Sequence, residues 1–139
     1  MNYSYFKDYY SLTMMNYQCI EHDVKLIYAF MCKGDIDSNY EGIENMTLGQ
    51  MIVVLESLDY SDDSPFISRS DYKFLKRICD KRNYWAHQAF VDFVYIEDFA
   101  NSKEYKNICT SLKNDYEEVK RASDILQSMR IEFCKRHKR

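Results

Sequence analysis

Residues 5–33 read YFKDYYSLTMMNYQCIEHDVKLIYAFMCK, and this stretch decides the fold class. Apolar side chains recur at steps of three and four residues, which keeps them on one face of an α-helix for about seven turns. Gly34 follows at a place where helices commonly end. The sequence therefore predicts one long amphipathic helix whose buried positions are Phe6, Tyr10, Tyr17, Ile20, Val24, Ile27 and Met31.

Three segments further along the chain have the same periodicity. Thr47 is a suitable N-cap for the second helix, Ser70 for the third, and Asn101 or Ser102 for the last. The third helix is expected to end near Phe90 and to carry Arg82 within its apolar stripe. The expected buried positions of the second helix are Leu48, Met51, Ile52, Leu55 and Leu58. Those of the third helix are Phe74, Ile78, Trp85 and Ala89. Those of the last helix are Tyr105, Ile108, Leu112, Tyr116, Val119, Leu126, Met129 and Phe133.

The segments between these helices complete the predicted layout. Residues 35–45 and 61–65 are polar and contain Gly42 and Pro65, so they indicate breaks. Residues 91–99 are ambiguous between a helix extension, a short extended piece and the start of the next element. Four helices with short or moderate loops predict an all-α, four-helix up-and-down bundle. We expect a single domain over residues 1–139, with a frayed basic tail at 135–139.

Composition excludes several classes of protein. Three glycines and one proline among 139 residues are too few for the many turns of an all-β fold. The five cysteines form no C-x-x-C pair, which argues against a zinc site or a disulfide framework. No apolar run approaches the length of a membrane span or of a signal peptide. We therefore expect a cytoplasmic protein with reduced thiols, no metal and no cofactor.

One segment carries a chemical signature. Residues 80–87 read DKRNYWAH, in which Asn83 follows Arg82 and four residues separate Arg82 from His87. This pattern resembles the R-x4-6-H motif of the HEPN superfamily, where a polar residue, often Asn, follows the Arg. HEPN domains are four-helix bundles with the motif near the end of the third long helix, as predicted here. The sequence-specific match covers Arg82, Asn83 and His87, and the layout covers most of the chain.

The resemblance implies a metal-independent endoribonuclease that works as a homodimer, with two motifs facing each other across one cleft. His87 would move protons near neutral pH, Arg82 would stabilise phosphate charge, and Asn83 would hydrogen-bond either partner or the substrate. Helix geometry is consistent with a composite site, because residues five apart lie about 140° apart around the axis. Small stand-alone domains of this kind are commonly toxins of toxin–antitoxin or phage-defence systems, with an antitoxin or regulatory protein as a further partner.

Basic residues lead into the motif, although the net charge of the chain is −3. Lys73, Lys76, Arg77 and Lys81 are candidates for steering RNA phosphates, or else form an ordinary solvated face. Tyr84 is a candidate for flanking the cleft, whereas Trp85 is expected in the core and His22 on the surface. One HEPN toxin branch continues the motif as H-x-Y, but Gln88 and Ala89 follow His87 here. That departure argues against a nucleotidyltransferase partner that modifies the Tyr.

Other functions remain open at this point. Arg82 and His87 also suit a structural role, because cations near a helix C-terminus interact favourably with its dipole. A non-catalytic module could bind another protein through its dimer surface or through the aromatic-rich first helix. A third possibility is an RNA-binding bundle without catalysis.

Overall fold

The computed structural model describes residues 1–137, and within them the chain is helical with no strand. The expected all-α fold is confirmed. One short helix lies within 35–45, where the sequence predicted only a loop. The elements are α1 (Tyr3–Met31), α2 (Ile36–Glu41), α3 (Leu48–Asp59), α4 (Arg69–His87), the 3-10 helix η1 (Phe99–Asn101) and α5 (Lys103–Arg136).

Local capping explains most helix starts. Thr47 and Gln50 form a reciprocal capping box at α3, in which each backbone N–H donates to the other residue's side chain. Ser102, one of the two residues expected to cap the last helix, caps α5. The expected cap at Ser70 is wrong, because Ser68 accepts the Asp71 N–H and begins α4 two residues earlier.

The ends of the first and last helices also differ from expectation. Helix α1 ends at Met31, and Gly34 follows it with a φ of 98°, a conformation that favours glycine. Helix α5 continues through Arg136, so Lys135 and Arg136 belong to the helix and not to a frayed tail. Lys138 and Arg139 lie outside the described residues.

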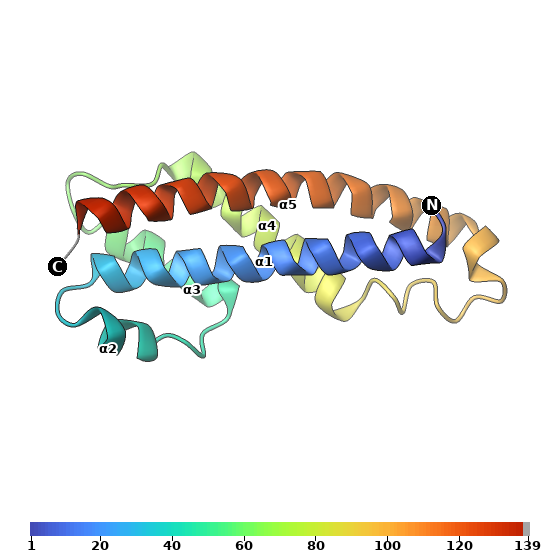
Figure 1. Ribbon diagram of the computed structural model, residues 1–139, viewed down its shortest axis with the longest axis horizontal. Coiled ribbons are helices and arrows are strands. Elements are labelled where there is room, and N and C mark those ends of the chain that lie inside the picture. Colours follow the sequence, from blue (N-terminus) through green and yellow to red (C-terminus); the bar gives the residue numbers. More distant parts are fainter. Residues whose placement is uncertain (138–139) are drawn as a thin grey trace.

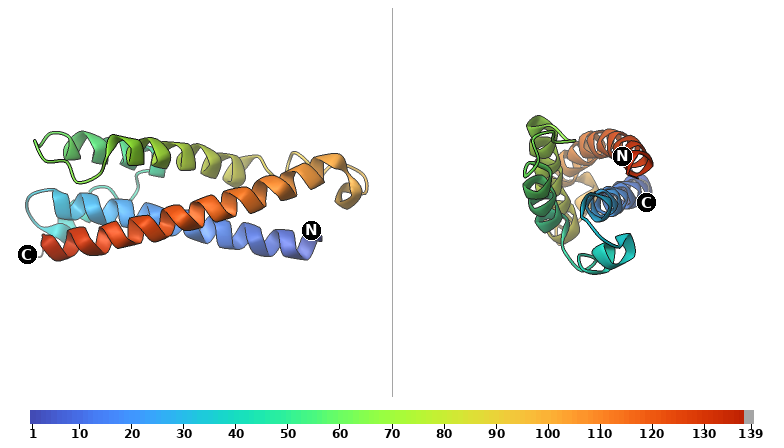
Figure 2. Two further views of the ribbon diagram at one scale, coloured as in Figure 1. Left: turned by 90° about the horizontal axis from the view of Figure 1, so that it is seen from above. Right: turned by 90° about the vertical axis from the view of Figure 1, so that its left-hand side faces the viewer.

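The helix directions are not those of an up-and-down bundle. Tyr9 contacts Tyr116, and Asp23 pairs with Arg130, so α1 and α5 run side by side in the same direction (Figure 1). Helix α4 runs opposite to both neighbours in sequence. Asp59 and then Glu56 of α3 contact Tyr72 and Lys76, and Asp115 and then Glu118 of α5 contact Lys81 and Arg77. Helices α1, α3 and α5 therefore share one direction and α4 has the other (Figure 2).

The connection between α1 and α3 is the physical reason for this departure. After Met31 the chain turns back along α1, where Asn39 donates to the carbonyl of Ala29 and Lys25 donates to the carbonyl of Glu44. Helix α2 occupies this return path. Helix α3 consequently begins again partway along α1 and runs parallel to it.

The core lies between the α1–α5 pair and the α3–α4 pair (Figure 2). At the end near residue 1, Phe6 is fully buried and makes edge-on ring contacts with Phe90 and Phe93. Burying each such side chain stabilises the fold by roughly 1.5–3 kcal/mol. The residues that follow α4 are thereby attached to α1.

Asp59 fixes the other end of α4. This buried carboxylate accepts the backbone N–H groups of Phe66 and Ile67 and the Tyr72 hydroxyl, at 2.7, 3.0 and 2.7 Å. Burial, together with the hydrogen bond from the Tyr72 hydroxyl to Asp59, raises the pKa of Tyr72. One side chain of α3 thus holds both the α3–α4 turn and the first turn of α4, which sets the register of the helix that carries the motif.

Candidate active site

The three motif residues lie on the last two turns of α4. Asn83 and His87 are exposed, Arg82 is half-buried, and His87 is the last residue of the helix. Arg82 Nη1 lies 3.5 Å from Asn83 Oδ1, a long hydrogen bond. Within residues 1–137 no hydrogen bond joins Arg82 to His87. The structure therefore brings Arg82 and Asn83 together and leaves His87 separate.

Trp85 holds this turn in place. Its side chain is 1% exposed, which confirms its expected place in the core. The indole Nε1 donates to Asp115 Oδ2 of α5 at 2.8 Å, and the Trp85 carbonyl accepts the Tyr10 hydroxyl of α1 at 3.1 Å. Burial raises the pKa of Tyr10, and the nearby charge of Arg82 opposes part of that rise. The motif turn is thus held by both long helices.

Helix α4 ends at His87, so the expected end near Phe90 is wrong. Asp92 accepts hydrogen bonds from Gln88 Nε2 and from the Tyr84 hydroxyl, each at 2.8 Å, and these bonds lower the pKa of Asp92. Burial and the bond to Asp92 raise the pKa of Tyr84 to about 12. Residues 88–98 form successive turns, and Phe90 and Phe93 pack inward. Tyr84, proposed to flank a cleft, is thereby tied to these turns.

The basic cluster divides between two sides of α4. Arg69 and Lys76 pair with Glu56 of α3. Arg77 and Lys81 pair with Glu118 of α5, and Lys81 also reaches Asp115. Arg82 and Lys73 form no ion pair within residues 1–137. Most positive charge along α4 is therefore neutralised internally, and the cation left beside His87 is Arg82.

These acidic partners could not be identified from the sequence. Arg77 and Glu118 are 41 positions apart, and neither α3 nor α5 has a local signal that predicts a contact with α4. A direct contact of Lys73, Lys76, Arg77 or Lys81 with RNA stays a prediction.

Replacing Glu118 by Gln is expected to reduce the loss of stability in acid. Burial opposes ionisation of Glu118, but hydrogen bonds from Arg77 and Lys81 lower the pKa of the carboxyl in the folded state. A lowered folded-state pKa stabilises the protein above the unfolded-state pKa of about 4.3, and this stabilisation is lost as the pH falls through the folded-state value. Urea denaturation between about pH 3 and pH 7 should show wild type losing about 1 kcal/mol more than Glu118→Gln. Glu117→Gln is the matched control, because exposed Glu117 forms no ion pair within residues 1–137. Identical slopes for all three proteins would contradict the prediction.

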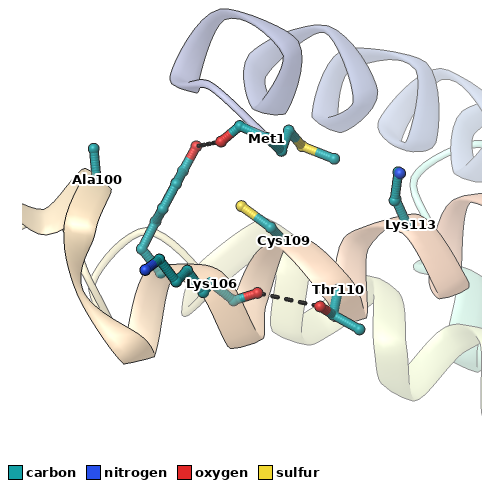
Figure 3. Close-up of a pocket in the computed structure, with 7 residues that line it drawn as sticks. Met1, Ala100, Lys106, Cys109, Thr110 and Lys113 are labelled. Atoms are coloured by element: carbon teal, nitrogen blue, oxygen red, sulfur yellow. Dashed lines mark hydrogen bonds between the residues drawn. The ribbon is translucent and has the colours of Figure 1, made fainter.

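Two cavities lie away from the motif. The first has a volume of about 330 Å³ and lies between the N-terminal residue and α5 (Figure 3). Tyr105 donates its hydroxyl hydrogen to the Met1 carbonyl there, beside Lys106 and Cys109. The second, of about 1050 Å³, lies between the α3–α4 turn and the last turns of α5. Neither is lined by Arg82, Asn83 or His87.

No group of three or more metal-ligating side chains occurs within residues 1–137. No disulfide joins any of the five cysteines, all of which lie within residues 1–137. His22 is exposed, as expected, with its Nδ1 3.4 Å from the Tyr40 hydroxyl. In the same part of the chain, no helix combines the length and apolar character needed to cross a bilayer.

Comparison of the chain with protein-family models, with curated proteins and with solved structures gives no significant match. The resemblance to the HEPN superfamily therefore depends on Arg82, Asn83 and His87. It depends also on their position at the end of α4, the third of the four longer helices.

Proposed function

We propose that this chain is a HEPN-type endoribonuclease that cleaves RNA without a metal. The observation that carries the proposal is the contrast between ion-paired and unpaired basic residues along α4. Four of its cations are ion-paired with acidic side chains, whereas exposed Lys73 and, on the last two turns, Arg82 and His87 form no ion pair within residues 1–137. A guanidinium without a carboxylate partner can bind a phosphate, and an exposed imidazole can exchange protons with a substrate.

The proposed reaction uses the RNA's own 2′-hydroxyl. A histidine takes the 2′-hydroxyl proton while that oxygen bonds to phosphorus, and the bond from phosphorus to the 5′-oxygen breaks. A second proton donor protonates the leaving 5′-oxygen, which yields a 2′,3′-cyclic phosphate and a 5′-hydroxyl. Arg82 stabilises the negative charge that develops on the phosphoryl oxygens. Asn83 lies beside Arg82 and can orient the guanidinium or the phosphate.

In the proposed homodimer Arg82 lies beside the His87 of the other copy, an arrangement that one chain does not provide. Arg82 hydrogen-bonds to Asn83, and within residues 1–137 no hydrogen bond joins Arg82 to His87. About 140° of helix rotation separates Arg82 from His87. We propose a two-fold symmetric pair whose interface includes the end of α4, so that each α4 end faces the same end of the other copy. Arg82 of one copy can then meet His87 of its partner, and each dimer contains two such pairings. We therefore propose that a monomer is inactive even with every motif residue intact.

Cleavage of single-stranded RNA in the presence of a chelator tests the proposed function. Wild type should release products with 2′,3′-cyclic phosphate ends. Arg82→Ala and His87→Ala should each be slower by about 100-fold or more. Arg69→Ala is the matched control, because this arginine of α4 is paired with Glu56 and is not among the candidates for RNA contact. Equal rates for wild type, Arg82→Ala and His87→Ala would overturn the site.

The proposed biological role is that of a toxin in a toxin–antitoxin or phage-defence system, restrained by an antitoxin or regulatory protein. Wild-type expression would then arrest growth, whereas His87→Ala expression would not.

A non-catalytic interaction module is the second candidate. Helix α1 presents Tyr5, Leu12 and Met15 to solvent, and Tyr5 is 61% exposed. Apolar side chains exposed along one helix suit a protein partner. Stable co-purification with another protein, with no RNA cleavage by wild type, would favour this function. Salt-sensitive RNA binding that survives His87→Ala without cleavage would instead indicate an RNA-binding bundle.

A further inference from the structure

The turns that follow α4 present apolar side chains to solvent directly beyond the motif. Val91, Val94 and Tyr95 are all exposed, and Tyr95 is 85% exposed, more than any other large apolar residue within 1–137. Most aromatic rings at this end of the bundle pack against one another, as Phe90 and Phe93 do. Tyr95 has no such ring contact within the described residues.

The backbone beneath Tyr95 is well held. The Asp92 N–H donates to the Gln88 carbonyl at 3.3 Å, and the Val94 N–H donates to the Phe90 carbonyl at 2.8 Å. Phe90 and Phe93 anchor these turns in the core, and Asp92 ties them to α4 through Gln88 and Tyr84. Such compact turns hold Tyr95 within about 20 Å of His87.

Charge around Tyr95 favours an uncharged group over a phosphate. Asp92, Glu97 and Asp98 are exposed acidic residues of the same segment, while no lysine or arginine lies between His87 and Ser102. Carboxylates repel the RNA backbone, whereas the face of a base carries no net charge. Arg82 remains the group suited to the phosphate.

We propose that Tyr95 stacks on an unpaired base of single-stranded RNA whose phosphate is bound at the Arg82–His87 site. This inference rests on the proposed function and names its substrate as single-stranded RNA. Stacking on an aromatic side chain accepts any of the four bases, because each has a π-face. Tyr95 is a binding residue and takes no part in proton transfer.

Kinetics with single-stranded oligonucleotides test the proposal. Tyr95→Ala should raise KM about tenfold, and Tyr95→Phe, which keeps the ring, should stay within about twofold of wild type. Tyr5→Ala is the matched control, because Tyr5 is also an exposed tyrosine but lies on α1. The kcat should change little in any of the three. Since Tyr95 is almost fully exposed, its removal should leave the fold intact.

An abasic scan identifies the stacked base. One position near the cleaved bond should raise KM in wild type when its base is removed. The same abasic substitution should have no further effect in Tyr95→Ala, because the ring and the base act as one pair. Additive effects at every position would overturn the proposal.

Binding to His87→Ala protein, measured by fluorescence anisotropy, gives the same comparison without cleavage. The double variant Tyr95→Ala/His87→Ala should bind an intact oligonucleotide about tenfold more weakly than His87→Ala alone. Equal binding by the two proteins would overturn the stacking proposal, even if wild type cleaves RNA. A change from dimer to monomer in Tyr95→Ala, seen by sedimentation, would also overturn it, because Tyr95 would then contact a second copy. Absence of cleavage by wild type, with the tenfold binding difference intact, would contradict only the proposed function.

Discussion

Equal amounts of Arg82→Ala and His87→Ala protein, mixed so that subunits exchange, should recover about a quarter of the wild-type cleavage rate. Each variant alone should be slower than wild type by about 100-fold or more. The recovery is expected because the proposed site takes Arg82 from one chain and His87 from the other.

The expected recovery of a quarter of the wild-type rate is the product of two factors of one half. Random exchange of two variants makes about half of all dimers mixed, by the statistics of a symmetric pair. Each mixed dimer then contains one intact pairing of Arg82 with the partner's His87 and one pairing that lacks both side chains. Cleavage rates measured over a range of mixing ratios should peak at equal amounts.

A mixture that should not recover is the control for this experiment. Arg82→Ala combined with the double variant Arg82→Ala/His87→Ala contains no intact Arg82, so its rate should stay at the level of the single variant. If the first mixture also fails to recover after subunit exchange, Arg82 and His87 act within one chain. That result would remove the physical reason proposed for the dimer.

Trp85→Ala should lower the free energy of unfolding by about 4 kcal/mol. The indole is almost completely buried, and its loss leaves a cavity and removes one of the donors to the Asp115 carboxylate, which keeps its ion pair with Lys81. Trp85→Phe keeps most of the buried ring and removes the hydrogen bond, so its effect should be about 1–2 kcal/mol. Urea denaturation followed by circular dichroism measures both.

An exposed residue provides the comparison for Trp85. Val53 lies on the solvent side of α3, and Val53→Ala should change stability by about 0.5 kcal/mol or less. A Trp85→Ala protein with the same denaturation midpoint as Val53→Ala would show that Trp85 does not hold the motif turn in the core.

The sequence was sufficient for features that depend on residues close together along the chain. Periodicity at three and four residues located the longer helices, and Trp85 was correctly assigned to the core. Thr47 was recognisable as a cap, and Ser102 as one of two candidates, because a cap bonds to a backbone N–H only two or three residues away. The sequence also placed Arg82, Asn83 and His87 late in the third long helix.

The sequence did not decide where α4 begins and ends, because neighbouring residues suit each position equally well. Ser68 and Ser70 are both suitable caps, and the hydrogen bonds from Phe66 and Ile67 to Asp59 decide between them by fixing the chain just before Ser68. The end of α4 was likewise undecided, because Ala89 and Phe90 continue its apolar pattern. Contacts of the following residues with α1, together with the Asp92 hydrogen bonds, end the helix at His87.

Tertiary structure alone determined how helices and charges meet. The direction of each helix depends on the return of residues 32–47 along α1, which periodicity does not encode. Ion pairs between α4 and its neighbours join residues 13 to 41 positions apart and neutralise four of its cations. The sequence does not show which basic residues of α4 are ion-paired. Only the folded chain shows that Arg82 and His87, like Lys73, are left without acidic partners within residues 1–137, because pairing depends on which carboxylates the packing of α3 and α5 brings within reach.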